Sequence, residues 1–92
     1  MVAEIITIGD EIITGFTTDT NSAWLSRALL DAGIRTEFHT SVGDTVSLIE
    51  SAISVALKRA DLVITTGGLG PTEDDLTKRA IVRVFRRNLV FN

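Results

Sequence analysis

The sequence predicts an α/β domain in which helices cover both faces of a mainly parallel β-sheet. Three short runs rich in β-branched residues alternate with segments whose apolar residues recur at helical spacing. No pair of these runs is separated by the two-residue turn typical of a β-hairpin. Strands that alternate with helices run parallel and are joined by right-handed crossovers. We therefore expect a three-layer α/β/α sandwich.

The first strand is predicted over residues 2–8, which are mostly apolar and show little alternation, so both faces should be buried. Gly9 ends this strand, and residues 9–15 form a loop. Residues 18–22 offer several oxygens that could cap a helix, and Gly33 is expected to close that helix in the left-handed conformation. The apolar residues at helical spacing, which we expect to include core positions, are Trp24, Leu25, Ala28, Leu29 and Ala32.

In residues 34–42, apolar or threonine side chains alternate with charged or strongly polar ones. This alternation predicts a half-exposed strand at the edge of the sheet. His39 falls on the more polar side, and we expect it at the surface. Asp44 or Thr45 should cap the following helix. The wide apolar stripe of that helix, expected to pack on the sheet, comprises Leu48, Ile49, Ala52, Ile53, Ala56, Leu57 and Ala60.

A third apolar strand is predicted over residues 61–66 and runs directly into a glycine-rich loop at 67–75. A last helix should follow, with its buried face formed by Leu76, Ala80, Ile81, Val84 and Phe85. Residues 89–92 begin another apolar segment. Three strands are few for a sheet of this class, so we interpret residues 1–92 as the N-terminal portion of a single, truncated domain.

Composition narrows the classes of function. The net charge of −3 and pI near 4.9 argue against a nucleic-acid-binding protein, although basic residues gather in the last predicted helix, where a solvated face explains them. The lack of cysteine excludes disulfides and thiolate metal sites. No apolar run is long enough to span a membrane, so a cytoplasmic location is expected. A chain this short buries limited surface, which favours an oligomer or a truncated piece of a larger domain.

Two loops that follow strand ends are candidates for a binding site. With strand order 2-1-3, the loops after the first and third strands would face one crevice, where ligands bind in open parallel sheets. Gly67, Gly68 and Gly70 would let backbone N–H groups approach a phosphate, with Thr72 and Lys78 beside them. The spacing matches neither a Walker loop nor a dinucleotide-binding loop. A tight connection without a ligand is the alternative.

Carboxylates also gather at the predicted strand ends. Part of this cluster, Thr72 to Asp75, is equally explained as a helix cap followed by acidic residues in the first turn. The cap at residues 72–75 does not explain why Asp10, Glu11 and Asp44 also follow the first and second strands. Carboxylates along one edge suit a Mg²⁺ ion bound to a phosphate substrate.

These motifs together resemble the CinA family, the competence/damage-inducible proteins, within the molybdopterin-binding superfamily that includes MogA, MoaB and gephyrin. The resemblance runs along the whole chain, over residues 9–15, 18–22, 42–44 and especially 66–75. It implies a molybdopterin-binding-domain-like fold and dimers or trimers. It also implies either metal-dependent hydrolysis of ADP-ribose to AMP and ribose 5-phosphate, as in CinA-type domains, or handling of molybdopterin, as in MogA-type relatives.

The resemblance assigns roles to individual residues. Asp44 and Asp75 match acidic positions used around metal and substrate, with Mg²⁺, Mn²⁺ or Co²⁺ as the ion. Gly67, Gly68 and Gly70 match the phosphate loop, and Glu11 matches the glutamate of the first loop. Asp10 stands where CinA often has threonine.

Three hypotheses remain open at this point. The first is a metal-dependent hydrolase of a nucleotide pyrophosphate. The second is a non-catalytic module that binds a nucleotide or a pterin. The third is a truncated product without independent function. The deamidase domain of full-length CinA has no counterpart in the chain.

Overall fold

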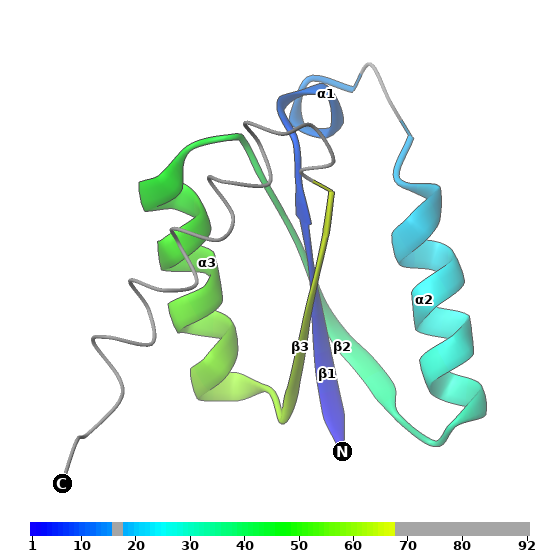
Figure 1. Ribbon diagram of the computed structural model, residues 1–92. Coiled ribbons are helices and arrows are strands. Elements are labelled where there is room, and N and C mark those ends of the chain that lie inside the picture. The colour runs from blue at the N-terminus through cyan, green and yellow to red at the C-terminus, as the bar shows by residue number, and fades with distance from the viewer. Residues whose placement is uncertain (16–17, 68–92) are drawn as a thin grey trace, which may run out of the picture.

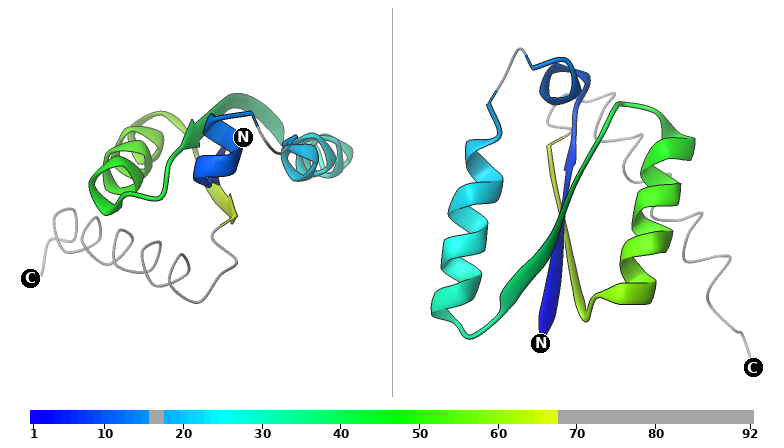
Figure 2. Two further views of the ribbon diagram at one scale, coloured as in Figure 1. Left: turned by 90° about the horizontal axis from the view of Figure 1, so that it is seen from above. Right: turned by 180° about the vertical axis from the view of Figure 1, so that it is seen from behind.

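The computed structural model describes residues 1–15 and 18–67, which form a parallel sheet with helices on both faces (Figure 1). The elements in chain order are β1 (Val2–Ile8), α1 (Asp10–Ile13), α2 (Thr20–Asp31), β2 (Arg35–Val42), α3 (Val46–Arg59) and β3 (Leu62–Gly67). The strand order is β2-β1-β3, and α2 and α3 lie on opposite faces of the sheet (Figure 2). The predicted α/β/α class and strand order are confirmed.

The central strand owes its position to its composition. β1 pairs with β2 on one side and with β3 on the other, and from Ala3 to Ile8 every residue is buried. β2 instead alternates between exposed and half-buried residues, as predicted for an edge strand. A run buried on both faces needs side chains that are apolar or, as with Glu4 and Thr7, hydrogen-bonded, whereas an edge strand needs apolar side chains on one face.

The apolar core lies between the sheet and α3. Ile6 and Ile8 of β1 pack with three buried residues of the helix, Ile49, Ile53 and Ala56. The predicted stripe was too wide, because Leu48 and Leu57 are 52% and 44% exposed. Only the helix positions nearest the sheet lose their contact with water.

The other helix is held by polar contacts. The Asp19 carboxylate caps α2 by accepting from the backbone N–H of Ser22 at 3.1 Å. It also accepts from the hydroxyls of Ser22 and Thr7, both at 2.6 Å. These two hydroxyl residues are buried, so the side of α2 that faces the sheet begins at Ser22.

The expectation that Trp24 belongs to the core is wrong, because it is 64% exposed. Successive helix residues project about 100° apart, so Trp24 points roughly 200° away from the buried Ser22. Helical spacing identified the apolar residues of α2 without showing which of them face the sheet.

The predicted helix ends are confirmed in part. Gly33 has φ 82° and donates to the Leu30 carbonyl at 2.9 Å, while Ile34 donates to Leu29 at 2.8 Å, the pattern of a Schellman motif. Thr45 is the N-cap of α3, although its side chain makes no capping hydrogen bond. The loop predicted over residues 9–15 contains the short helix α1.

The last predicted helix and residues 89–92 lie outside the described residues. Across residues 1–15 and 18–67, no helix is long and apolar enough to cross a membrane.

Candidate functional site

The carboxyl ends of the three strands meet at one edge of the sheet. Ile8, the last residue of β1, lies opposite Val42 of β2 and Gly67 of β3. The backbone N–H of Gly9 donates to the Val42 carbonyl at 2.9 Å, which continues the pairing beyond the strand. Neighbouring strands lie about 4.8 Å apart, so the ends of β2 and β3 are separated by roughly 10 Å across β1. The carboxyl ends of β1 and β3 lie side by side, as the predicted crevice requires.

Two aspartates join the loops after β1 and β2. The backbone N–H of Asp44 donates to Asp10 Oδ1 at 2.9 Å, and the backbone N–H of Asp10 donates to Asp44 Oδ2 at 3.2 Å. Each carboxylate therefore accepts a hydrogen bond from the other residue's main chain. Hydrogen bonds to carboxylates are stronger than those between neutral groups. The exchange fixes the geometry of Asp44 relative to β1.

Gly43 makes this exchange possible. A Cβ atom at position 43 would lie 2.6 Å from Asp10 Oδ1, closer than real Cβ atoms approach an oxygen. The sequence analysis placed Asp10 among the carboxylates at the strand ends but did not predict its contact with Asp44. The glycine directly before Asp44 was the available signal, since glycine permits another group to approach the backbone closely.

Among the predicted site residues, Asp44 is distinguished by a buried carboxylate oxygen. Its Oδ1 atom is buried and accepts no hydrogen bond in the described part of the chain. A buried carboxylate oxygen without a partner is costly unless a ligand or an ion satisfies it. Hard cations such as Mg²⁺ take oxygen ligands, so this atom fits the divalent metal that the resemblance implies.

Glu11 lies in α1, and its carboxylate folds back over Gly9. A Cβ atom at position 9 would be 2.6 Å from Glu11 Oε1. The residue is exposed, and the structure records no hydrogen bond from its carboxylate to Asp44. Glu11 is thus at the predicted edge of the sheet, but Asp10 is the residue that contacts Asp44.

The rest of the predicted phosphate and metal set lies outside the described residues: Gly68, Gly70, Thr72, Asp75 and Lys78. Residues 1–15 and 18–67 contain no group of three acidic, histidine or cysteine side chains able to hold a metal. A metal at Asp44 would therefore need further ligands from the remaining chain, from substrate or from water.

His39 is exposed, as predicted. Its Nε2 atom lies 3.1 Å from Ser26 Oγ, which also lies 2.8 Å from the Ser22 carbonyl oxygen.

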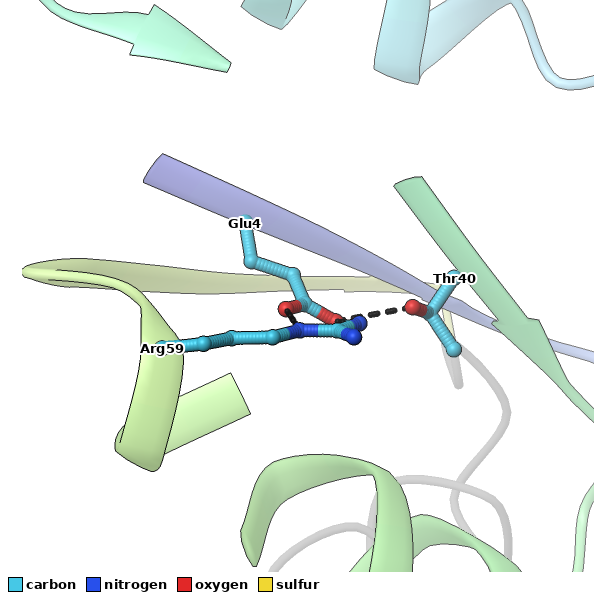
Figure 3. A network of polar contacts seen from close by, with 3 residues as sticks. All are labelled: Glu4, Thr40 and Arg59. Carbon is cyan, nitrogen blue, oxygen red and sulfur yellow. Dashed lines mark hydrogen bonds and ion pairs between the residues drawn. The ribbon is translucent and has the colours of Figure 1, made fainter. Parts of the chain in front are cut away.

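A second polar cluster, which the sequence analysis missed, lies on the α3 face of the sheet (Figure 3). The fully buried Glu4 carboxylate accepts from Arg59 Nε at 2.7 Å and Nη2 at 3.0 Å, and from Thr40 Oγ1 at 2.8 Å. The guanidinium of Arg59 also lies 3.9 Å from the centre of the Phe38 ring. Glu4 precedes the end of β1 by about 13 Å of strand, so this cluster is structural and separate from the carboxyl edge.

Comparison with known proteins identifies the family. The family described as "Probable molybdopterin binding domain" matches residues 4–92. The chain belongs to the molybdopterin-binding domain family. The resemblance to CinA is also confirmed, because relatives that carry this name match over the whole chain. A CinA-like protein of Dictyoglomus thermophilum is 46% identical over 92 residues, which is all of this chain and 22% of the relative.

Solved structures agree with this assignment. CinA from Thermoplasma acidophilum, described as a protein of unknown function, superposes with a TM-score of 0.88 and 37% identity, over 94% of this chain and 52% of that one. The molybdopterin biosynthesis enzyme MoaB of Thermus thermophilus has a TM-score of 0.79 over 89% of this chain and 53% of its own. At 23% identity, MoaB shows a shared fold. The chain spans about a fifth of the curated relatives and about half of these solved chains.

Proposed function

We propose that this molybdopterin-binding-type domain binds an adenine nucleotide sugar at the carboxyl edge of its sheet and hydrolyses the pyrophosphate with a divalent metal ion. ADP-ribose, cleaved to AMP and ribose 5-phosphate, is the substrate that the resemblance to CinA suggests. The observation that supports this most directly is Asp44 Oδ1, which is buried and has no hydrogen-bond partner among residues 1–15 and 18–67, at the edge where Gly67 also ends its strand. A roughly 10 Å separation of those strand ends suits a ligand with two phosphates and a nucleoside.

Asp44 and Asp75 would hold the ion, which is Mg²⁺, Mn²⁺ or Co²⁺. When bound, such an ion neutralises charge on the pyrophosphate oxygens. The amides of the 67–70 loop would hold the phosphate, assisted by Thr72 and Lys78. Glu11 would orient the attacking water from its place over Gly9.

The alternative proposal is a non-catalytic module that binds molybdopterin or a nucleotide. The description of the family as molybdopterin-binding favours it, and it uses the same edge of the sheet. Under either proposal the protein acts as a cytoplasmic homo-oligomer, without nucleic acid or membrane as a partner.

The test is AMP release from ADP-ribose by the purified protein with each metal, with a chelator control and with an Asp44→Asn variant. Metal-dependent release that Asp44→Asn abolishes, while circular dichroism shows an unchanged fold, would support the hydrolase. Binding of ADP-ribose or molybdopterin without release would support the alternative. A folded protein that neither binds nor cleaves would overturn both.

A further inference from the structure

The Asp10–Asp44 exchange links two loops that are 34 residues apart in the chain. The side chain of an aspartate just before a helix usually caps that helix. Here the N-cap of α3 is Thr45, and Asp44 Oδ2 accepts a hydrogen bond from the backbone N–H of Asp10 instead. The side chain of Asp44 is therefore oriented by the neighbouring loop and not by its own helix.

We infer that Asp10 is a positioning residue that aims the free carboxylate oxygen of Asp44 at the carboxyl edge of the sheet. The inference rests on the proposed function, because it presumes that Asp44 Oδ1 is a metal ligand. Asp10 acts through Asp44 and does not itself touch the ion.

The geometry supports this role at both ends of Asp44. The hydrogen bond from its N–H to Asp10 Oδ1 fixes its backbone, and the hydrogen bond from the Asp10 N–H to Oδ2 fixes the plane of its carboxylate. With one oxygen held, the direction of the other is set, and that other oxygen is the buried Oδ1. Partners that orient a metal ligand in this way typically change metal affinity by about 10- to 100-fold when they are removed.

The experiment compares Asp10→Ala, which removes the acceptor for the Asp44 N–H, with Asp10→Asn, which keeps an oxygen at that position. Asp31→Ala, an exposed aspartate in α2, is the control for the loss of one negative charge. Mn²⁺ affinity is measured by calorimetry, and exchange of the Asp44 amide hydrogen is measured by NMR. Asp10→Ala keeps the backbone N–H that holds Asp44 Oδ2 but releases the Asp44 N–H, so we expect it to weaken Mn²⁺ binding by about 10-fold and to speed amide exchange. Asp10→Asn should recover most of the affinity, and Asp31→Ala should behave as the wild type.

Equal loss of affinity in Asp10→Asn and Asp10→Ala would overturn the inference, because it would make Asp10 a ligand itself. Wild-type affinity in a folded Asp10→Ala would overturn it as well. If Asp10→Ala does not fold, Gly43→Ala tests the same contact, since its Cβ would lie 2.6 Å from Asp10 Oδ1.

Failure of the proposed function gives a different result. If the wild type binds no Mn²⁺, the hydrolase proposal loses its metal, and amide exchange alone decides the role of Asp10. Faster exchange at Asp44 in Asp10→Ala but not in Asp10→Asn would still support positioning. Unchanged exchange in both variants would overturn it.

Discussion

Gly67 and Gly33 both adopt the left-handed backbone conformation, with φ of 98° and 82°, but their surroundings differ. A Cβ atom at position 67 would run into the carbonyl oxygen of Ile8, whereas at position 33 nothing among the described residues lies within 4 Å. Glycine is therefore required at 67 both by its conformation and by the close approach of β3 to the end of β1. That requirement holds the end of β3 close to the end of β1.

Replacement of each glycine by alanine should separate these two requirements. Gly33→Ala should lower the free energy of unfolding by roughly 1–2 kcal/mol, the cost of the left-handed conformation. Gly67→Ala should lower the free energy of unfolding by about 1–3 kcal/mol more than Gly33→Ala does, because the added methyl group has no space. Urea denaturation of both variants measures the difference. Equal losses would mean that the ends of β1 and β3 are not in contact in solution.

At the scale of elements, β1 and α3 are tied by the Glu4–Arg59 ion pair. Burial raises the pKa of the Glu4 carboxyl, but hydrogen bonds from Arg59 and Thr40, with the Arg59 charge, outweigh burial and hold the pKa below its usual value. A lowered pKa means that the charged carboxylate stabilises the fold above the unfolded-state pKa of 4.5. That stabilisation is lost as the pH falls through the lower pKa of the folded state.

Arg59→Leu should therefore destabilise the protein most at neutral pH, where it leaves the buried Glu4 charged and unpaired. The loss should shrink as the pH falls toward 4, since Glu4 can then bind a proton. Thermal unfolding at pH 7 and pH 4 measures the change, with Arg27→Leu on the exposed side of α2 as the control. The double variant Glu4→Leu, Arg59→Leu should recover much of the stability at pH 7. A loss independent of pH would contradict the assigned ion pair.

The elements that repeat a simple pattern could be predicted from the sequence. The apolar run of β1 and the alternation of β2 report burial directly, and Gly33 ends α2 as expected. Contacts between distant residues could not be predicted in this way. Glu4 is the one charged residue of β1, and its partner Arg59 lies 55 residues away.

The candidate site divides in the same way. Asp44 was predicted from its place after a strand, and the structure shows its buried oxygen there. Asp10 was also predicted at this edge, but its contact with Asp44 was not, because that contact joins residues 34 positions apart in the chain. Asp75 and the rest of the phosphate loop remain predictions, since they lie outside the described residues.

At the scale of the described molecule, the two faces of the sheet are stabilised differently. The α3 face carries the apolar core around Ile49 and Ile53. On the α2 face, Asp19 collects hydrogen bonds from Thr7 and Ser22. Burial raises the pKa of Asp19, yet these hydrogen bonds and the nearby His39 hold it below its usual value. The cluster of buried apolar side chains therefore lies on the α3 face, while Ile5 is the large apolar residue of β1 that is buried on the α2 face.

This asymmetry predicts unequal effects of removing large side chains. Ile49→Ala should lower the free energy of unfolding by about 2–5 kcal/mol, because Ile49 is completely buried. Trp24→Gln should change it by no more than about 0.5 kcal/mol, because Trp24 is 64% exposed. Urea denaturation followed by circular dichroism suits both variants, since Trp24 is the sole tryptophan and its fluorescence disappears with it.

If Trp24→Gln lowered the free energy of unfolding by much more than this, the indole would be covered in solution. Unfolding measured at several protein concentrations would then identify the cover. Binding of a second copy stabilises the folded state by mass action, so the unfolding midpoint of the wild type would rise with concentration while that of Trp24→Gln would not. A midpoint independent of concentration in both proteins would instead assign the cover to the same chain, and the α2 face would then be completed from within the domain.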